Sequence, residues 1–193
     1  MVKNFIRRYI SEIKSKFDLV DHRVISDIIV KLNSCEKNNA TVYVIGNGGS
    51  AATASHIQND LGVGLKRRGL LNLNIVSLCD NLSVITAIAN DVGYESVFFY
   101  QIKDVIKKND LLIAISCSGN SKNIIKAVKY SKDIGATVIG MTGFDGGELK
   151  KLADISYHIE TKEGDYGVVE DMHMMLDHMI YTYYIEGINK NDR

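Results

Sequence analysis

Two loops rich in glycine and serine carry residue types that bind anions. The first, GNGGS at 46–50, follows the apolar run 41–45 and leads into a helix-like segment. Glycines allow positive φ angles and close approach of a ligand, while a helix start offers free N–H groups and the positive end of its dipole. The loop predicts a site for an anionic or oxygen-rich ligand; a tight turn that merely needs glycine is the simpler alternative.

The second loop, SCSGNS at 116–121, follows the apolar run 110–116 and also leads into a helix-like segment. Its hydroxyl groups and backbone N–H groups could together bind an anion. Either serine cluster alone could instead be an ordinary helix N-cap. Both follow strands of one expected parallel sheet, however, so they converge on the crevice where such folds bind ligands.

Residues 46–51 also fit G-x-G-x-x-A, the phosphate-binding pattern of dinucleotide folds. That fold needs an acidic residue about 20 positions further on, at the end of the second strand, to hold a ribose hydroxyl. Here that distance falls on the basic cluster 66–68, and the acid that ends the second strand is Asp80. The spacing disfavours a dinucleotide site. The basic cluster suits either a solvated loop or contact with an anionic substrate or a neighbouring subunit.

Histidines and carboxylates with helical spacing are candidates for proton transfer or metal binding. His56 and Asp60 are four positions apart and therefore share one face of the helix after the first loop, although such a pair is often only a surface hydrogen bond. The final helix carries four polar residues among methionines and tyrosines: Glu170, His173, Asp177 and His178. Glu170 and His173 have the i, i+3 spacing of metal sites in helical bundles. Glu170 and His178 are about 12 Å apart along the helix, so one ion could bind both only through long reaches or a second subunit.

The elements that must position these residues alternate between strand and helix. Short apolar runs bounded by Gly, Asn, Asp or Ser occur at 41–45, 73–78, 110–116 and 137–142, with a weaker run at 153–159. Helical periodicity separates them. Strands that are apolar on both faces and alternate with helices indicate an α/β fold with a parallel sheet covered on both sides.

Helices are also expected at both ends of the chain. Residues 2–38 contain apolar positions at spacings of three and four, which predicts two amphipathic helices. The stretch 167–188 has no helix breaker for about 20 residues after Gly167 and is apolar nearly all round, as a buried helix is. Together they offer more apolar helical surface than one small sheet can cover, so we expect an oligomer.

Length and composition restrict the class of protein. The 193 residues, 46% of them hydrophobic, suffice for a single domain at 1–193. Because 23 Lys and Arg balance 23 Asp and Glu, there is no basic field for nucleic acid. The odd number of cysteines, without a CxxC pair, suits a reducing compartment. There is no unbroken signal-like apolar core and no run long enough to span a bilayer. We therefore expect a soluble cytoplasmic protein with no membrane and no nucleic-acid partner.

Four segments together resemble the sugar isomerase (SIS) superfamily, and within it the phosphoheptose isomerases. They are GNGGSAA, ITAIANDVGYE, ISCSGNS and MTGFDGGEL, and the similarity extends over nearly the whole chain. The resemblance implies a five-stranded parallel sheet between helices and a homotetramer with active sites between subunits. It also implies conversion of sedoheptulose 7-phosphate to D-glycero-D-manno-heptose 7-phosphate through an enediol, for lipopolysaccharide or capsule biosynthesis.

The resemblance also assigns roles by motif position. Phosphate would be held by Ser116, Ser118 and Ser121. The rest of the substrate would be contacted by Asn47, Gly48, Gly49, Ser50, Asp91 and Glu170. A metal, expected to be zinc, would be bound by His56, Asp60, Glu170 and His178. Asp60 would be the general base and His178 the general acid, while His173 matches a family histidine without an assigned role.

Three residues depart from the family pattern. Asp60 stands where the family has a glutamate, so its carboxylate is one methylene shorter. Glu170 replaces a glutamine, which makes the expected ligand set more anionic and would also admit iron or manganese. Cys117 replaces a threonine and is more readily a small buried residue than a hydrogen-bond donor. Two alternatives remain at this point: an SIS-fold regulator that binds a phosphosugar or a protein without catalysis, and an isomerase of another sugar phosphate.

Overall fold

The sheet at the centre of the molecule confirms the predicted α/β class. The structure is a computed structural model, and it describes residues 1–187. Five parallel strands stand in the order β2-β1-β3-β4-β5. They are β1 (Thr41–Ile45), β2 (Asn74–Ser77), β3 (Leu111–Ser116), β4 (Thr137–Thr142) and β5 (Ile155–His158). Each lies within the apolar run that predicted it.

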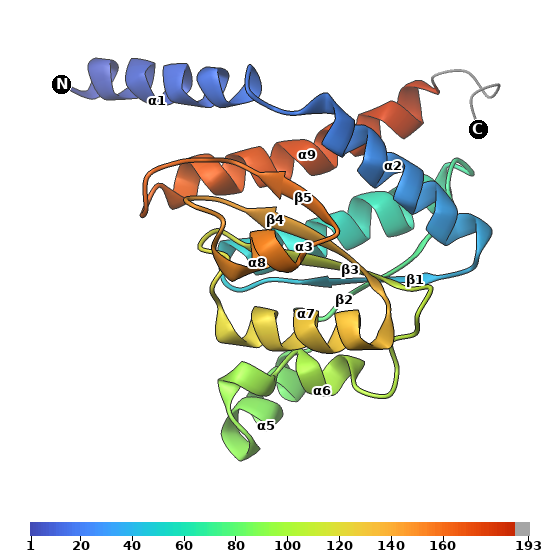
Figure 1. The fold of residues 1–193 in the computed structure, drawn as a ribbon. Coiled ribbons are helices and arrows are strands. Elements are labelled where there is room, and N and C mark those ends of the chain that lie inside the picture. The colour runs from blue at the N-terminus through green and yellow to red at the C-terminus, as the bar shows by residue number, and fades with distance from the viewer. Residues whose placement is uncertain (188–193) are drawn as a thin grey trace.

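Helices cover both faces of this sheet, as Figure 1 shows. The longer ones are α1 (Val2–Phe17), α2 (His22–Lys37), α3 (Gly49–Ile57), α5 (Leu82–Asp91), α7 (Lys122–Ile134) and α9 (Tyr166–Glu186). The short ones are α4 (Leu65–Arg67), α6 (Phe99–Ile102), α8 (Gly147–Leu152), the π-helix η1 (Gln58–Gly64) and the 3-10 helix η2 (Tyr94–Ser96). Helices α2, α3 and α9 pack on one face, and α6 and α7 on the other.

Strand residues alternate between two apolar cores, because successive side chains of a strand point to opposite faces. Val42 and Ile113 belong to the core under α2, α3 and α9, whereas Tyr43 and Leu112 belong to the core under α7. All of β3 is buried. Such two-sided burial is the reason that the strands are apolar without interruption in the sequence.

The terminal helices differ in how much of their surface is covered by the rest of the chain. In α9 the buried residues form one face, and Met174, Met175 and Tyr183 on its other sides are only partly covered. No residue of α1 is buried, and Figure 1 shows this helix extending beyond the body of the molecule. Ile188, the end of the predicted final helix, and the rest of the predicted domain up to residue 193 lie outside the described residues. Within residues 1–187, no helix combines the length and the apolarity needed to cross a membrane.

The strand order determines where a ligand can bind. From β1 the chain crosses to β2 at one edge, and β3 then returns to the other side of β1 and leads on to β4 and β5. The loops after β1 and β3 therefore meet at the point where the strand order reverses, which is the usual ligand crevice of open parallel sheets. Both predicted anion loops lie there.

Candidate active site

The loop after β1 is shaped by its glycines. A Cβ on Gly46 would lie 2.5 Å from the carbonyl oxygen of Ser50, so only glycine fits at the start of the turn. Gly48, the N-cap of α3, has a φ of +54° in open space. This geometry brings the chain directly from the strand into α3, with the first N–H groups of the helix facing the crevice.

Asn47 in this loop is held by three hydrogen bonds. Its Nδ2 donates to Oδ1 of Asn123 over 3.0 Å, and Nδ2 of Asn123 donates back to its Oδ1 over 2.8 Å. The hydroxyl of Tyr94 donates to the same Oδ1 over 2.7 Å. Asn123 and Tyr94 were not predicted as site residues, because only the fold brings η2 and the first turn of α7 to this loop.

The serine loop after β3 leaves its hydroxyl groups available to a ligand. The Oγ atoms of Ser116 and Ser121 lie 3.2 Å apart. Ser121 is the N-cap residue of α7, yet its side chain makes no capping hydrogen bond. Oγ of Ser118 accepts a hydrogen bond from the N–H of Asn120 over 3.2 Å. The three hydroxyls thus gather at a helix start that also presents uncapped N–H groups.

Backbone hydrogen bonds connect the segment after β4 to the serine loop. The N–H of Leu149 donates to the carbonyl of Gly119 over 2.9 Å, and the N–H of Gly143 donates to the carbonyl of Cys117 over 2.9 Å. Gly119 has a φ of +64°, and a Cβ there would lie 2.0 Å from the carbonyl oxygen of Gly146. The segment MTGFDGGEL is therefore a backbone support for the anion loop.

A cleft of about 130 Å³ opens between the two loops. It is lined by Asn47, Ser50, Ile115, Ser116, Cys117, Ser118, Ser121, Tyr166 and Glu170. Tyr166 is a lining residue that was not predicted. Burial, followed by the negative charge of Glu170, raises the pKa of the Cys117 thiol, so this cysteine is a neutral wall of the cleft.

The carboxylate of Glu170 lies against the first turn of α3. A Cβ on Gly49 would be 2.4 Å from both of its carboxylate oxygens. A carboxylate at a helix N-terminus is favoured by the helix dipole. Because Glu170 already supplies negative charge at the start of α3, the serine loop at the start of α7 is the better site for a phosphate.

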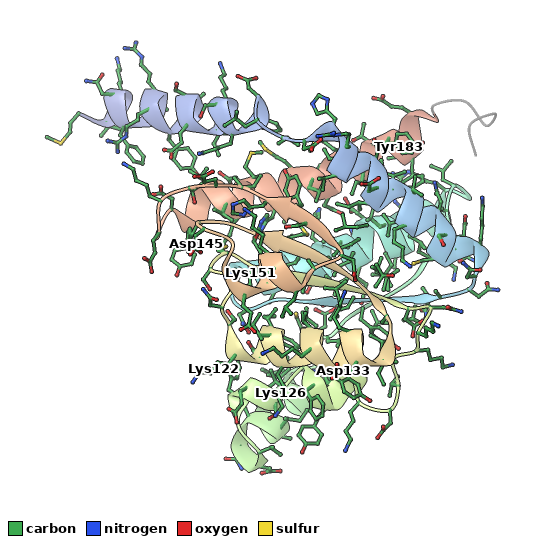
Figure 2. All side chains as sticks on the ribbon, viewed as in Figure 1. Lys122, Lys126, Asp133, Asp145, Lys151 and Tyr183 are labelled. Carbon is green, nitrogen blue, oxygen red and sulfur yellow. The ribbon has the colours of Figure 1, made fainter. Side chains whose placement is uncertain are left out.

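No lysine or arginine among residues 1–187 lines this cleft. Lys122 and Lys126 project from α7 on the side away from the sheet in Figure 2. Nζ of Lys126 donates to Oγ of Ser96 over 2.9 Å and lies 5.0 Å from the ring centre of Phe99. The basic cluster 66–68 is exposed and does not line the cleft either. An anion in the cleft would therefore be held by hydroxyl and backbone N–H groups.

Beside the cleft, at the far end of α3, four side chains form a His/Asp cluster suited to a metal ion. The cluster comprises His56, Asp60, Asp177 and His178, whose ligand atoms all lie within 4.8 Å of one another. Nε2 of His56 is 3.2 Å from Nε2 of His178 and 3.4 Å from Oδ2 of Asp60. It is 3.8 Å from Oδ2 of Asp177.

The two carboxylates of this cluster lie in different environments. Asp60 lies in the π-helix η1, a widened turn of a kind that is frequent at functional sites, and its Oδ1 accepts a hydrogen bond from Asn59 over 2.8 Å. The side chain of Asp177 is 0% exposed, while that of His56 is 38% exposed. Burial, followed by the charge of Asp60, raises the pKa of Asp177 to about 7.

The parallel course of α3 and α9 separates Glu170 from the cluster. At the start of both helices, the Glu170 carboxylate lies against Gly49. At the other end of α3, Nε2 of His178 lies 3.2 Å from Nε2 of His56. The Glu170–Gly49 contact is thus roughly 10–12 Å from the His178–His56 contact along the helices. Of the four residues to which the resemblance assigned a metal, the structure brings together His56, Asp60 and His178, adds Asp177, and places Glu170 in the cleft.

His173 and Asp91 lie outside both groups. His173 is completely buried, its Nε2 is 3.3 Å from the carbonyl oxygen of Thr142, and burial lowers its pKa to about 4, so it is a neutral core residue. Asp91, at the end of α5, is exposed and accepts a hydrogen bond from Asn90 over 2.8 Å. It does not line the cleft of this protomer.

Comparisons with known proteins identify the family and the fold of this chain. The family model described as SIS domain matches residues 6–143. The phosphoheptose isomerase of Aliarcobacter butzleri is 42% identical over 146 residues, which are 75% of this chain and 75% of that protein. The probable phosphoheptose isomerase of Thermoplasma acidophilum is 37% identical over 176 residues, covering 90% of this chain and 94% of that protein.

A solved structure extends the similarity to three dimensions. The phosphoheptose isomerase of Neisseria gonorrhoeae superposes with a TM-score of 0.84 at 26% sequence identity. The match covers 96% of this chain and 97% of that chain, so it includes both the N-terminal helices and α9.

Proposed function

Because the chain belongs to the SIS domain family and, within it, to the phosphoheptose isomerases, we propose that it converts sedoheptulose 7-phosphate to D-glycero-D-manno-heptose 7-phosphate. One observation carries this proposal beyond the similarity: the serine-lined cleft lies at one end of α3 and the His/Asp cluster at the other. Ser50 and His56 are about 9 Å apart along that helix. This separation suits a substrate whose phosphate and carbonyl group lie at opposite ends of its carbon chain.

The phosphate end of the substrate is assigned to the serine loop. Ser116, Ser118 and Ser121 would donate hydrogen bonds to the phosphate oxygens, aided by the first N–H groups of α7. Asn47, fixed by Tyr94 and Asn123, would contact sugar hydroxyls. The assignments of Gly48, Gly49, Ser50, Asp91 and Glu170 to the sugar remain part of this proposal.

The reaction itself is a proton transfer between neighbouring carbons. We assign Asp60 as the base that takes a proton from C1 of the ketose and returns it to C2, through an enediol. His178 would protonate O2 and accept the proton of O1, so that the carbonyl group moves from C2 to C1. Nε2 of His178 and Oδ2 of Asp60 lie 3.2 and 3.4 Å from the same atom, Nε2 of His56, and this proximity supports their action on one substrate end.

The His/Asp cluster fits a divalent metal, and we propose zinc. Imidazole nitrogens and carboxylate oxygens are common zinc ligands, and one ligand atom from each of these four side chains lies within 4.8 Å of the others. Iron or manganese would also accept such a set. When bound, the metal would polarise the carbonyl group as a Lewis acid. His56, Asp60 and His178 would hold it, whereas the place of Glu170 in the cleft gives its expected metal role no support from geometry.

We further propose that the protein works as a cytoplasmic homotetramer supplying heptose for lipopolysaccharide or capsule. The exposed apolar residues of α1, with side chains of Phe5, Ile6 and Ile10 between 47% and 56% exposed, support an assembly through this helix. Cys35, Cys79 and Cys117 are all free thiols, as is usual in a reducing compartment.

The decisive experiment is an isomerase assay on the purified protein. With sedoheptulose 7-phosphate, the wild type should form an aldoheptose 7-phosphate. Asp60→Ala and His178→Ala should each lower kcat by at least about 100-fold, because each removes a proton-transfer group. Glu186→Gln, an exposed change on α9, should leave the rate unchanged.

Other outcomes would identify the alternatives. Turnover at the wild-type rate in both variants would refute the assigned roles. Binding of phosphosugars without turnover of any would indicate a regulator, and turnover of a different phosphosugar would change the substrate. In deuterated water the product should carry deuterium at C2, since the proton passes through Asp60; a product without deuterium would indicate a hydride shift instead.

A further inference from the structure

Asp177 has a buried carboxylate group without hydrogen-bond partners. The residue is 2% exposed, and neither of its carboxylate oxygens has a donor within hydrogen-bond distance. Burying an unpaired carboxylate is among the most costly arrangements in a protein interior. A buried carboxylate of this kind either takes up a proton or is neutralised by a cation bound beside it.

Among residues 1–187, the cavity beside Asp177 offers its carboxylate no polar partner. On its inner side is a cavity of about 20 Å³ lined by apolar side chains of α2, α3, η1, α9 and the sheet, including Ile57, Leu61 and Ile180. The space would admit about one water molecule, but a buried water needs two to four polar partners, and Asp177 is the one polar side chain in this lining. The open side of Asp177 faces His56, where its Oδ2 is 3.8 Å from Nε2.

The donor atoms around His56 have the spacing of a coordination sphere. Two atoms bound to one tetrahedral zinc ion at about 2.0–2.1 Å lie roughly 3.3–3.4 Å apart. The distances from Nε2 of His56 to His178, Asp60 and Asp177 are 3.2, 3.4 and 3.8 Å. A proton on Nε2 of His56 could form a hydrogen bond to one of these three atoms. A single cation could be coordinated by all of them together with His56.

We propose that Asp177 is a metal ligand, and that the divalent-cation site of this chain consists of His56, Asp60, Asp177 and His178. This rests on the metal site of the proposed function and changes its composition, because Asp177 takes the place that the family resemblance gives to Glu170. Asp177 forms the buried floor of the site, while the more exposed histidines form its rim. Glu170 is then left in the cleft, against Gly49, to contact the sugar.

Metal binding itself, measured without substrate, tests this assignment. Metal-free wild type, Asp177→Asn, Glu170→Gln and Glu186→Gln should be titrated with Zn²⁺ by calorimetry and with Co²⁺ by absorption spectroscopy. Asp177→Asn should weaken Zn²⁺ binding by at least about 100-fold, since it removes a ligand rather than an outer partner. Glu170→Gln and Glu186→Gln should keep the wild-type affinity and the wild-type Co²⁺ spectrum.

A second variant gives a positive signal that does not depend on lost affinity. In Asp177→Cys the new thiolate should coordinate Co²⁺ and add a sulfur-to-cobalt charge-transfer band that wild type lacks, whereas Glu170→Cys should not. Thermal unfolding adds a readout of the fold: Zn²⁺ should raise Tm of wild type and of Glu170→Gln but not of Asp177→Asn.

The inference is wrong if wild type binds neither ion, if Asp177→Asn binds Zn²⁺ as tightly as wild type, or if Glu170→Gln alone loses the metal. It is also wrong if Asp177→Cys binds Co²⁺ without the new band. Because none of these measurements uses a substrate, they stand apart from the isomerase assay. A wild type that isomerises sedoheptulose 7-phosphate but fails here retains the function and loses only the Asp177 site.

Discussion

At the scale of single residues, Ser121, which we propose binds the phosphate, differs from an N-cap residue that only stabilises its helix. It occupies the N-cap position of α7, but its hydroxyl lies 3.2 Å from that of Ser116 and makes no capping bond. Asp21 at the start of α2 does the opposite, since its side chain accepts a hydrogen bond from the N–H of Arg23. Substitutions at Ser121 and Asp21 can therefore be compared directly, because both are N-cap residues and only Asp21 makes a capping hydrogen bond.

Ser121→Ala should raise KM for the sugar phosphate about tenfold, as expected for one lost hydrogen bond to a charged group. It should change the free energy of unfolding by less than about 0.5 kcal/mol, because no cap is lost. Asp21→Ala should have the reverse effect, a loss of about 1 kcal/mol of stability with unchanged KM. Steady-state kinetics and urea unfolding measure both quantities. A Ser121→Ala protein that is destabilised like Asp21→Ala, with normal KM, would show that Ser121 is only a cap.

At the scale of elements, the serine loop depends on the glycine-rich loop behind it. Gly119 and Gly69 have nearly the same φ, +64° and +67°, but a Cβ on Gly119 would lie 2.0 Å from a backbone oxygen, whereas nothing lies within 4 Å of one on Gly69. Gly69→Ala should therefore cost only about 1 kcal/mol, for the left-handed conformation. Gly119→Ala should cost clearly more, about 3 kcal/mol, and should weaken phosphate binding because the two loops must separate.

Urea unfolding of both glycine variants, with calorimetry of inorganic phosphate binding, provides the comparison. The difference between them isolates the contact between the loops, because the backbone strain is common to both. Equal destabilisation and unchanged phosphate affinity in the two variants would mean that the loop after β4 does not hold the serine loop in place.

The elements also differ in how far the sequence alone predicts them. The strands and the positions of the two glycine- and serine-rich loops were predictable, because two-sided burial makes each strand a continuous apolar run that ends in polar loop residues. The widened turn of η1 was not, because a shift in backbone hydrogen bonding leaves no periodic pattern. Asp177 was visible as a polar residue in an apolar helix. Its proximity to His56 depends on how α9 is rotated against α3, which only the packed structure determines.

At the scale of the whole molecule, α1 is the element that the protomer alone does not explain. It is an amphipathic helix with no buried residue, and two hydrogen bonds tie it to the body: the Tyr9 hydroxyl donates to Asp171 on α9 over 2.6 Å, and Nζ of Lys16 donates to the carbonyl of Glu160 over 2.5 Å. An apolar face that is left exposed in this way is typical of a surface that another copy of the chain covers. The prediction of an oligomer from the surplus of apolar helices remains a prediction, and α1 is the place to test it.

The double variant Ile6→Asp/Ile10→Asp should convert a tetramer into smaller species, because two charges at i, i+4 spacing would have to be buried between subunits. Arg7→Asp/Ser11→Asp, with the same spacing and both positions exposed, is the matched control and should leave the assembly intact. Sedimentation velocity measures the size, and circular dichroism should show unchanged helicity, since Ile6 and Ile10 are exposed and do not pack against the core. If active sites lie between subunits, isomerase activity should fall with the tetramer fraction and recover at high protein concentration. A monomeric wild type, or a double variant that stays tetrameric, would exclude α1 as the assembly surface.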